Sequence, residues 1–416
     1  MLKGAIASTF AANFVTNLLA SGSVLVLAIF LQETDIAQVR LIQAYIIIGI
    51  TIASLGFTTG VLKYCAASDK QIDNWALLNK TIILTSYASL GYIAVVSVAI
   101  FTTTTNWDDP RLIVLLPLAL ISVPLGVVVE LFRNFLYAKN QFATAASAQI
   151  FVRIWTFAIT ITLAYAYALS GYVAGTVISF LFGALRFARE VSFKFREAGT
   201  APHTELPSGF LKFSAFAMLG NLFVIAGSYG DILLLDSLDI DRNILGAYAL
   251  ASALAGGIMV ITTSIQTVIS PDMIRSVASP DRLKKAFIRA QVRLAILSIG
   301  VAVCTIFFVA FVFPIIYVDK YRLTPELFAG LCINYVLVSC GTLGGSVLIG
   351  YGKTSINTII AGSALIAGFI CGYLLVLEFA VWGMVWAKLI YGLVFVLLSN
   401  SLALKQLRTQ SNKEFK

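Results

Sequence analysis

Four ionisable side chains lie inside long apolar runs of this sequence: Glu130, Arg153, Asp231 and Lys388. A charge near the middle of a lipid bilayer costs about 2.5–3.5 kcal/mol on insertion scales, so such residues usually face protein or a water-filled cavity and have a function. A carboxylate there can take up a proton or an ion, and a cation can hold an anionic group. These residues therefore predict binding and ion coupling.

Arg153 belongs to a polar stripe in an apolar segment. Gln149, Arg153, Thr156 and Thr160 recur at helical spacing, so they lie on one face of a helix. Such a face lines a hydrated cavity or a contact with another helix. In the alternative interpretation, Arg153 extends along the helix to the inner membrane interface.

Asp231 ends a second stripe, which contains Ser214, Asn221 and Ser228. Three interpretations of Asp231 stay open: a cavity-facing carboxylate that couples or gates transport, a buried carboxylate satisfied by a neighbouring helix, and a carboxylate hydrated at the rim. The sequence alone does not choose among them.

Lys388 lies about two turns from the outer end of the last apolar segment, so it can line a cavity or extend outward to the interface. Glu130 and Arg133 are one helical turn apart and can pair on the surface of their helix. This spacing favours a structural ion pair near the inner interface, although a coupling role for Glu130 is kept.

Apolar helices must position these residues, because 59% of the 416 residues are hydrophobic and only 12% are charged. Soluble proteins have about 25% charged residues. Continuous apolar runs long enough to cross a bilayer indicate an all-α polytopic membrane protein, and they exclude the alternating strands of a membrane barrel. Five cysteines without a CxxC pair and a single histidine exclude a metal framework. With no phosphate-binding loop and no paired catalytic carboxylates, we expect no enzyme and no cofactor.

About twelve membrane-spanning helices are expected, with kinks at Pro117 and Pro124. They cover residues 5–30, 37–62, 79–103, 111–136, 144–168, 171–190, 211–235, 244–269, 290–316, 327–350, 355–377 and 381–403. Most of the 29 Lys and Arg residues then fall on one side, which places both termini in the cytoplasm. The long connection at 193–209 divides the chain into two six-helix lobes, residues 1–200 and 201–416. Equal halves suggest an internal repeat.

Several motifs resemble those of a known family. The segment "GDILLLDSLDIDRNILGAYALA" carries an Asp near the outer end of helix seven and then a G-x-Y-x-x-A pattern, here Asp231, Gly246, Tyr248 and Ala251, with Pro271 at the inner end of helix eight. The segment "LGFTTGVLKYCA" is similar to L-G-x-x-x-G-x-x-[RK]-Y, with Lys63 in the basic position, and "VWGMVWAKLI" resembles a G-x-x-x-A segment of helix twelve. In these motifs, and in its length and span count, the chain resembles the Wzx-type flippases of the MOP (multidrug/oligosaccharidyl-lipid/polysaccharide) exporter superfamily.

The resemblance implies a MATE-like bundle of two lobes that opens a central cavity to either side in turn. It also implies a polyprenyl-diphosphate-linked oligosaccharide, such as an O-antigen repeat unit, moved from the cytoplasmic to the outer leaflet of a bacterial inner membrane during lipopolysaccharide biosynthesis. Coupling to H⁺ or Na⁺, contact with membrane lipid, and partnership with a polysaccharide polymerase and a chain-length regulator are expected. No nucleic-acid partner is expected.

A diphosphate needs cations in a wet cavity, and sugar hydroxyls need polar side chains. We therefore expect substrate-binding roles for Arg153, Lys63, Gln149, Asn221, Arg293 and Lys388, and coupling or gating roles for Asp231 and Glu130. Two other functions stay open. A drug/cation antiporter of the same superfamily would have a cavity rich in carboxylates, and a non-transporting scaffold of a glycan-assembly complex would use the polar stripes as packing seams.

Overall fold

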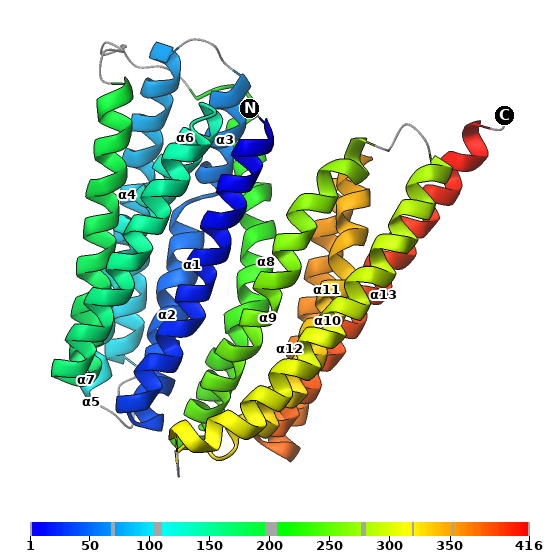
Figure 1. Ribbon diagram of the computed structural model, residues 1–416. Helices are drawn as coiled ribbons and strands as arrows, with labels where there is room; N and C mark the ends of the chain where they lie inside the picture. The colour runs from blue at the N-terminus through cyan, green and yellow to red at the C-terminus, as the bar shows by residue number, and fades with distance from the viewer. Residues whose placement is uncertain are drawn as a thin grey trace. The chain divides into compact units, whose positions relative to one another are not determined.

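The computed structural model describes residues 2–67, 71–102, 110–195, 206–275, 280–317, 320–351 and 353–414. These residues form helices α1 to α13, and no strand occurs among them (Figure 1). The helices are α1 (Leu2–Phe30), α2 (Glu33–Ala53), α3 (Phe57–Ala67), α4 (Gln71–Thr102), α5 (Pro110–Leu120), α6 (Ser122–Ala138), α7 (Phe142–Phe195), α8 (Phe210–Ser237), α9 (Arg242–Arg275), α10 (Pro280–Tyr317), α11 (Thr324–Gly350), α12 (Thr354–Phe379) and α13 (Val381–Glu414).

The predicted all-α membrane fold is confirmed. In the described part of the chain, 10 helices are long and apolar enough to cross a membrane. One of them is α7, which contains the fifth and sixth predicted spans, and the eighth predicted span is α9. The side chains in the second half of α9, including Pro271 of the family motif, lie outside the described residues.

The second predicted span, 37–62, is not one helix, which corrects the sequence analysis. The chain leaves helical geometry at Leu55 and Gly56, whose φ angles are +50° and +69°, and continues as α3. A Cβ on Gly56 would lie 1.9 Å from the carbonyl oxygen of Ser214 on α8. The break therefore needs glycine for its backbone angle and for close approach to α8.

The fourth predicted span, 111–136, is also divided, at Ile121 between α5 and α6. Pro124 follows three residues later and has no N–H to donate to the carbonyl of Leu120. The helix assignment is thus interrupted close to this proline, whereas Pro117 lies inside α5. The kinks at the two prolines stay predictions.

One turn recurs in the two halves of the chain. Ala168 divides α7 into two helices with φ 50° and ψ −131°, and Ala380 separates α12 from α13 with φ 48° and ψ −132°. Three residues after each of them, at Gly171 and Gly383, a Cβ would lie 1.9 and 2.1 Å from the carbonyl oxygen eight residues earlier. The same tight reversal at corresponding places supports the internal repeat.

The chain forms two compact units: residues 1–19 with 38–226, and residues 20–37 with 227–416. The core of unit 1 includes Val61, Leu131, Phe135, Phe187 and Phe210, so it joins α3, α6, α7 and the start of α8. The core of unit 2 joins α10, α11 and α13 through a cluster that contains Leu283, Phe287, Leu343, Val347 and Leu407. The predicted lobe boundary at residues 200 and 201 lies outside the described residues, and the division into lobes stays a prediction.

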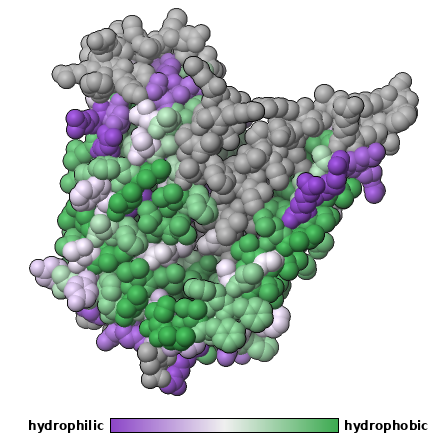
Figure 2. All heavy atoms as spheres, viewed as in Figure 1, coloured by the Kyte–Doolittle hydropathy of each residue, from purple (hydrophilic) through white to green (hydrophobic). Residues whose placement is uncertain are grey.

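Large apolar side chains cover the exposed faces of several helices. On α4 they include Ile83, Tyr87, Leu90, Val95 and Val98, and on α10 they include Ile296, Phe307, Phe308, Phe311 and Ile315. On the face drawn in Figure 2, hydrophobic residues cover the middle of the helices and hydrophilic residues lie toward the helix ends. Exposed apolar surface of this extent indicates lipid rather than water as the surrounding solvent.

Candidate functional site

The two ionisable residues predicted in the C-terminal half form a buried ion pair in unit 2. The Lys388 ammonium on α13 lies 2.8 Å from Oδ2 of Asp231 on α8. Asp231 is 3% exposed and Lys388 is 8% exposed. Both residues lie about 10 Å inside the end of their helix, as the rise of 1.5 Å per residue requires. The pair therefore lies in the apolar interior rather than at a hydrated rim.

Asp231 has further hydrogen-bond partners. The hydroxyl of Tyr248, on α9 and fully buried, donates to Oδ2 at 2.7 Å. The backbone N–H of Ile232 donates to Oδ1 at 3.0 Å. With the ammonium of Lys388, three donors surround the carboxylate, which is what a buried ionised carboxylate requires. Of the three interpretations of Asp231, a buried carboxylate satisfied by neighbouring helices matches this geometry.

Lys388 makes a second contact, because its ammonium donates to the carbonyl oxygen of Gly227 at 2.7 Å. Gly227 lies one turn before Asp231 on α8, and a carbonyl oxygen has two lone pairs, so it can accept from a side chain as well as from the helix. Small residues bring α13 close to α8: a Cβ on Gly227 would lie 3.1 Å from the Tyr391 hydroxyl.

The G-x-Y motif of the sequence has a structural explanation at this site. A Cβ on Gly246 would lie 2.0 Å from the carbonyl oxygen of Glu33, so glycine allows the start of α2 to pack on the start of α9. Tyr248 follows two residues later and reaches Asp231. The sequence did not predict that Asp231, Tyr248 and Lys388 meet. The available signal was that each lies about two turns from the same end of its apolar segment.

In unit 1, the polar stripe of α7 contacts α1. Arg153 is half-buried, and its Nε donates to the Thr16 carbonyl at 3.2 Å. Gln149 Nε2 donates to Asn13 Oδ1 and to Thr16 Oγ1, each at 3.4 Å. The Tyr137 hydroxyl on α6 donates to Gln149 Oε1 at 3.4 Å. The stripe thus forms a polar contact among three helices.

The predicted pair between Glu130 and Arg133 is present on α6, where Arg133 Nη2 donates to Glu130 Oε2. Their side chains are 33% and 28% exposed, so the pair lies at a partly open surface. Tyr137 follows one turn later and connects this face to Gln149. Unit 1 therefore has a continuous polar surface on α1, α6 and α7 that contains both a cation and a carboxylate.

Three predicted residues lie apart from these clusters. Lys63, at the end of α3, is exposed, and its ammonium lies 3.9 Å from the centre of the Phe213 ring on α8, as in a cation–π contact. Asn221 on α8 and Arg293 on α10 are exposed, and neither has a hydrogen bond or ion pair with the described residues.

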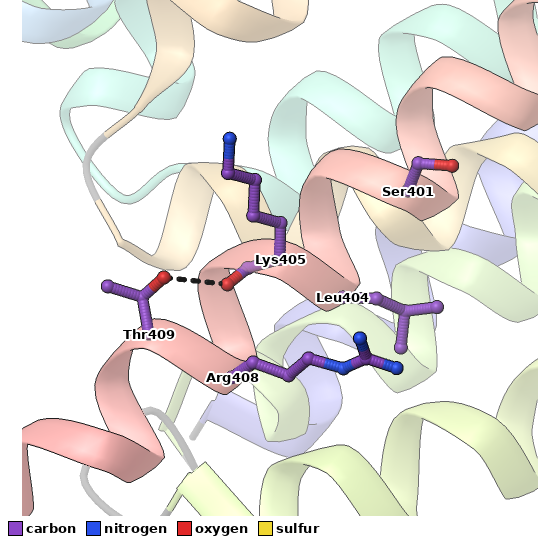
Figure 3. Close-up of a pocket in the computed structure, with 5 residues that line it drawn as sticks. All are labelled: Ser401, Leu404, Lys405, Arg408 and Thr409. Atoms are coloured by element: carbon purple, nitrogen blue, oxygen red, sulfur yellow. Dashed lines mark hydrogen bonds between the residues drawn. The ribbon is translucent and has the colours of Figure 1, made fainter.

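A shallow pocket of about 370 Å³ lies near the C-terminal end of α13. It is lined by Ser401, Leu404, Lys405, Arg408 and Thr409, which follow one helix face (Figure 3). The side chains of Lys405 and Arg408 extend in different directions, and Thr409 donates to the Lys405 carbonyl. The two cations do not converge on one anion here. Among the described residues no group of His, Cys, Asp and Glu is arranged to hold a metal ion.

Comparison with known proteins agrees with this architecture. The profile of a family described as polysaccharide biosynthesis protein matches residues 2–277. No curated protein matches the chain in sequence. A solved structure of a multidrug resistance MATE family transporter of the MOP superfamily, in the inward-facing conformation, is 14% identical with a TM-score of 0.76, over 97% of this chain and 96% of that chain.

Two further solved structures are similar. The outward-facing conformation of a multidrug resistance MATE family transporter is 14% identical with a TM-score of 0.72, over 98% of this chain and 96% of the other. The eukaryotic MATE transporter AtDTX14 is 12% identical with a TM-score of 0.70, over 99% and 98%. At these identities the likeness establishes the fold, which is MATE-like.

Proposed function

The chain belongs to the polysaccharide biosynthesis protein family, and from this premise we propose that it is a flippase for a lipid-linked oligosaccharide. Its cargo is a polyprenyl-diphosphate-linked repeat unit of an O-antigen or related polysaccharide. The protein moves this unit from the cytoplasmic to the outer leaflet of a bacterial inner membrane, with both termini in the cytoplasm. Transport proceeds by alternating access, without covalent catalysis.

The observation that carries this proposal is Arg153, a guanidinium in a membrane-spanning helix whose neighbours are polar. Its Nε is fixed by the Thr16 carbonyl, which orients the planar group. A guanidinium with a fixed orientation suits a diphosphate, because it can donate two parallel hydrogen bonds. Gln149 and Tyr137 on the same surface offer amide and hydroxyl groups to sugar hydroxyls.

Lys63, Asn221 and Arg293 extend this proposal. Each is exposed, and the ammonium of Lys63 is held only by aromatic rings among the described residues. Lys63 and Arg293 supply positive charge where an anionic headgroup arrives, and Asn221 contacts sugar. The polyprenyl chain stays among membrane lipids. A polysaccharide polymerase and a chain-length regulator receive the exported unit.

Coupling to H⁺ or Na⁺ is part of the proposal, with Asp231 and Glu130 as the carboxylates that respond. The membrane potential offers about 2.3 kcal/mol per charge per 100 mV, enough to bias a two-state equilibrium. Glu130 lies at a partly exposed surface, whereas Asp231 is buried with Lys388. The two carboxylates therefore differ in how readily an ion reaches them.

A drug/cation antiporter is the second candidate, because the similar solved structures are described as multidrug resistance transporters. A cationic cargo needs carboxylates that are not already neutralised. Glu130 is paired with Arg133 and Asp231 with Lys388, so each of these two carboxylates already has a cation. This pairing favours an anionic cargo. A non-transporting scaffold is the third candidate.

The test is to delete the gene in its native host and to label lipid-linked repeat units with a membrane-impermeant reagent that reaches only the outer leaflet. We expect unlabelled units to accumulate and the wild-type gene to restore labelling. If deletion leaves labelling unchanged in a host without another exporter, the glycan proposal is wrong. Resistance to cationic drugs that disappears on deletion would then favour the antiporter, and loss of the glycan-assembly complex without loss of flux would favour the scaffold.

A further inference from the structure

Two oxygen atoms contact the Lys388 ammonium, as oxygen ligands contact a bound monovalent cation. Nζ lies 2.8 Å from Asp231 Oδ2 and 2.7 Å from the Gly227 carbonyl oxygen. The Tyr248 hydroxyl oxygen lies 2.7 Å from the same carboxylate oxygen. The carboxylate and the main-chain carbonyl are hard oxygen ligands that together carry a single negative charge, which suits one positive charge, and the Tyr248 hydroxyl holds the carboxylate.

We propose that the Asp231 carboxylate, held by the Tyr248 hydroxyl, and the Gly227 carbonyl form a monovalent-cation site that the Lys388 ammonium fills as a tethered cation. Without the Lys388 side chain, the site would take a soluble monovalent cation. Ammonium would be preferred, because it has the charge and the hydrogen-bond donors of the group that it replaces. Sodium would be a weaker substitute.

The position of Lys388 on α13 makes the tether effective. The residue lies about 10 Å inside the helix, at the depth of Asp231 on α8 and of Tyr248 on α9. Burial leaves Asp231 without water, so its charge must be balanced inside the protein. A lysine held on a packed helix provides this balance at all salt concentrations, whereas a soluble ion would leave at low concentration.

Among the described residues, no second carboxylate near the pair competes with Asp231 for the Lys388 ammonium. Asp236, the next acidic residue on α8, is paired with Arg242. Asn334 lies on α11, faces α13 and is 3% exposed. Its Oδ1 has no hydrogen-bond partner in the described part of the chain. This oxygen lies 2.6 Å from where a Cβ on Gly392 would stand, one turn beyond Lys388. A buried acceptor on α11 therefore packs against α13 one turn from Lys388.

This inference rests on the coupling part of the proposed function and deepens it, since it concerns the ion held by Asp231, and it is independent of the cargo. For coupling it has one consequence: an external ion can reach Asp231 only after Lys388 has withdrawn. In the described conformation the protein would therefore be insensitive to Na⁺ at this site.

The experiment measures thermal unfolding of the purified full-length protein in detergent, in chloride salts of ammonium, sodium and choline at one ionic strength. We expect the wild-type Tm to be the same in all three salts. The Tm of Lys388→Ala should be lowered in choline, and ammonium should restore more than half of the loss, with sodium restoring less. Asp231→Asn/Lys388→Ala should show no response to ammonium, because the carboxylate is absent.

Lys353→Ala is the matched control, since the Lys353 ammonium donates to the neutral Gln406 Oε1 at 2.7 Å and has no carboxylate partner among the residues that the structure describes. Its Tm should not respond to ammonium. Lys388→Gln, which keeps a neutral donor, provides the same comparison if the alanine variant does not fold. The proposal would be overturned if each Lys388 variant had the same Tm in all three salts. It would also be overturned if the Tm of Lys353→Ala responded to ammonium as strongly as that of Lys388→Ala.

Discussion

Gly171 and Gly383 occupy equivalent positions in two copies of one turn. Each follows by three residues an alanine with a φ of about 50°, and each faces a carbonyl oxygen eight residues earlier on the preceding helix. The two sites are in different units and in different halves of the sequence. A strained alanine conformation retained at both places indicates that the turn geometry matters more than its local cost, which is of order 1–3 kcal/mol per residue.

Replacement of either glycine by alanine should lower the Tm. The new Cβ would lie about 2 Å from a backbone oxygen, so one of the two helices has to shift. Gly91→Ala on α4 and Gly300→Ala on α10 are the controls, since a Cβ there meets nothing within 4 Å. These controls should raise stability by about 0.5–1 kcal/mol, the usual gain for alanine in a helix. Equal effects at all four positions would contradict the steric argument.

The Asp231–Lys388 pair should show strong coupling in a double-mutant cycle. Asp231→Asn or Lys388→Met alone removes one partner of a buried ion pair, which typically costs about 3–5 kcal/mol. The double variant leaves no uncompensated charge, so its loss should be smaller than the sum of the single losses. Unfolding titrations in detergent mixtures measure all four proteins. Additive losses would mean that the two charges do not stabilise each other.

The sequence predicted the class of fold and the helices because apolar runs and span lengths depend on local composition. It also predicted the Glu130–Arg133 pair, since this pair depends on residues within one turn. The meeting of Asp231 with Lys388 and Tyr248 was not predicted. Which residues meet across helices depends on helix rotation as well as depth, and hydropathy indicates only the depth of a residue within its apolar segment. The break at Gly56 was missed for the same reason, because its cause is the close approach of Ser214.

The Tyr321 hydroxyl, between α10 and α11, should make stability depend on high pH. Burial raises the pKa of Tyr321 above its ordinary value of 10.0, and the neighbouring Glu33 carboxylate raises this pKa further. The unfolded chain loses this proton at a lower pH than the folded chain does. The contribution of Tyr321 is therefore complete below about pH 10 and is lost as the pH rises above that value.

Tyr321→Phe should reduce the fall in stability above pH 10. It also removes the hydrogen bond from the hydroxyl to the Leu31 carbonyl, 3.3 Å long, which contributes about 1 kcal/mol at neutral pH. The measurement is the difference in Tm between wild type and variant as a function of pH. If that difference is the same at pH 8 and pH 11, the tyrosine does not titrate as the argument requires.

The orientation of Arg153 leads to a prediction for transport. Arg153→Ala should abolish outer-leaflet labelling of lipid-linked repeat units, because no other residue of the α7 stripe carries a positive charge. Arg153→Lys should keep part of the transport, since an ammonium holds a phosphate as a point charge without the paired geometry of a guanidinium. Arg189→Ala is the control: Arg189 is also on α7 but is exposed near the helix end, and its loss should leave labelling unchanged.

The expression level and Tm of the variants are matched before their labelling rates are compared, because the hydrogen bond from Arg153 to Thr16 also joins α7 to α1. Full labelling by a folded Arg153→Ala protein would remove Arg153 from the binding site and leave it as a structural contact between these two helices.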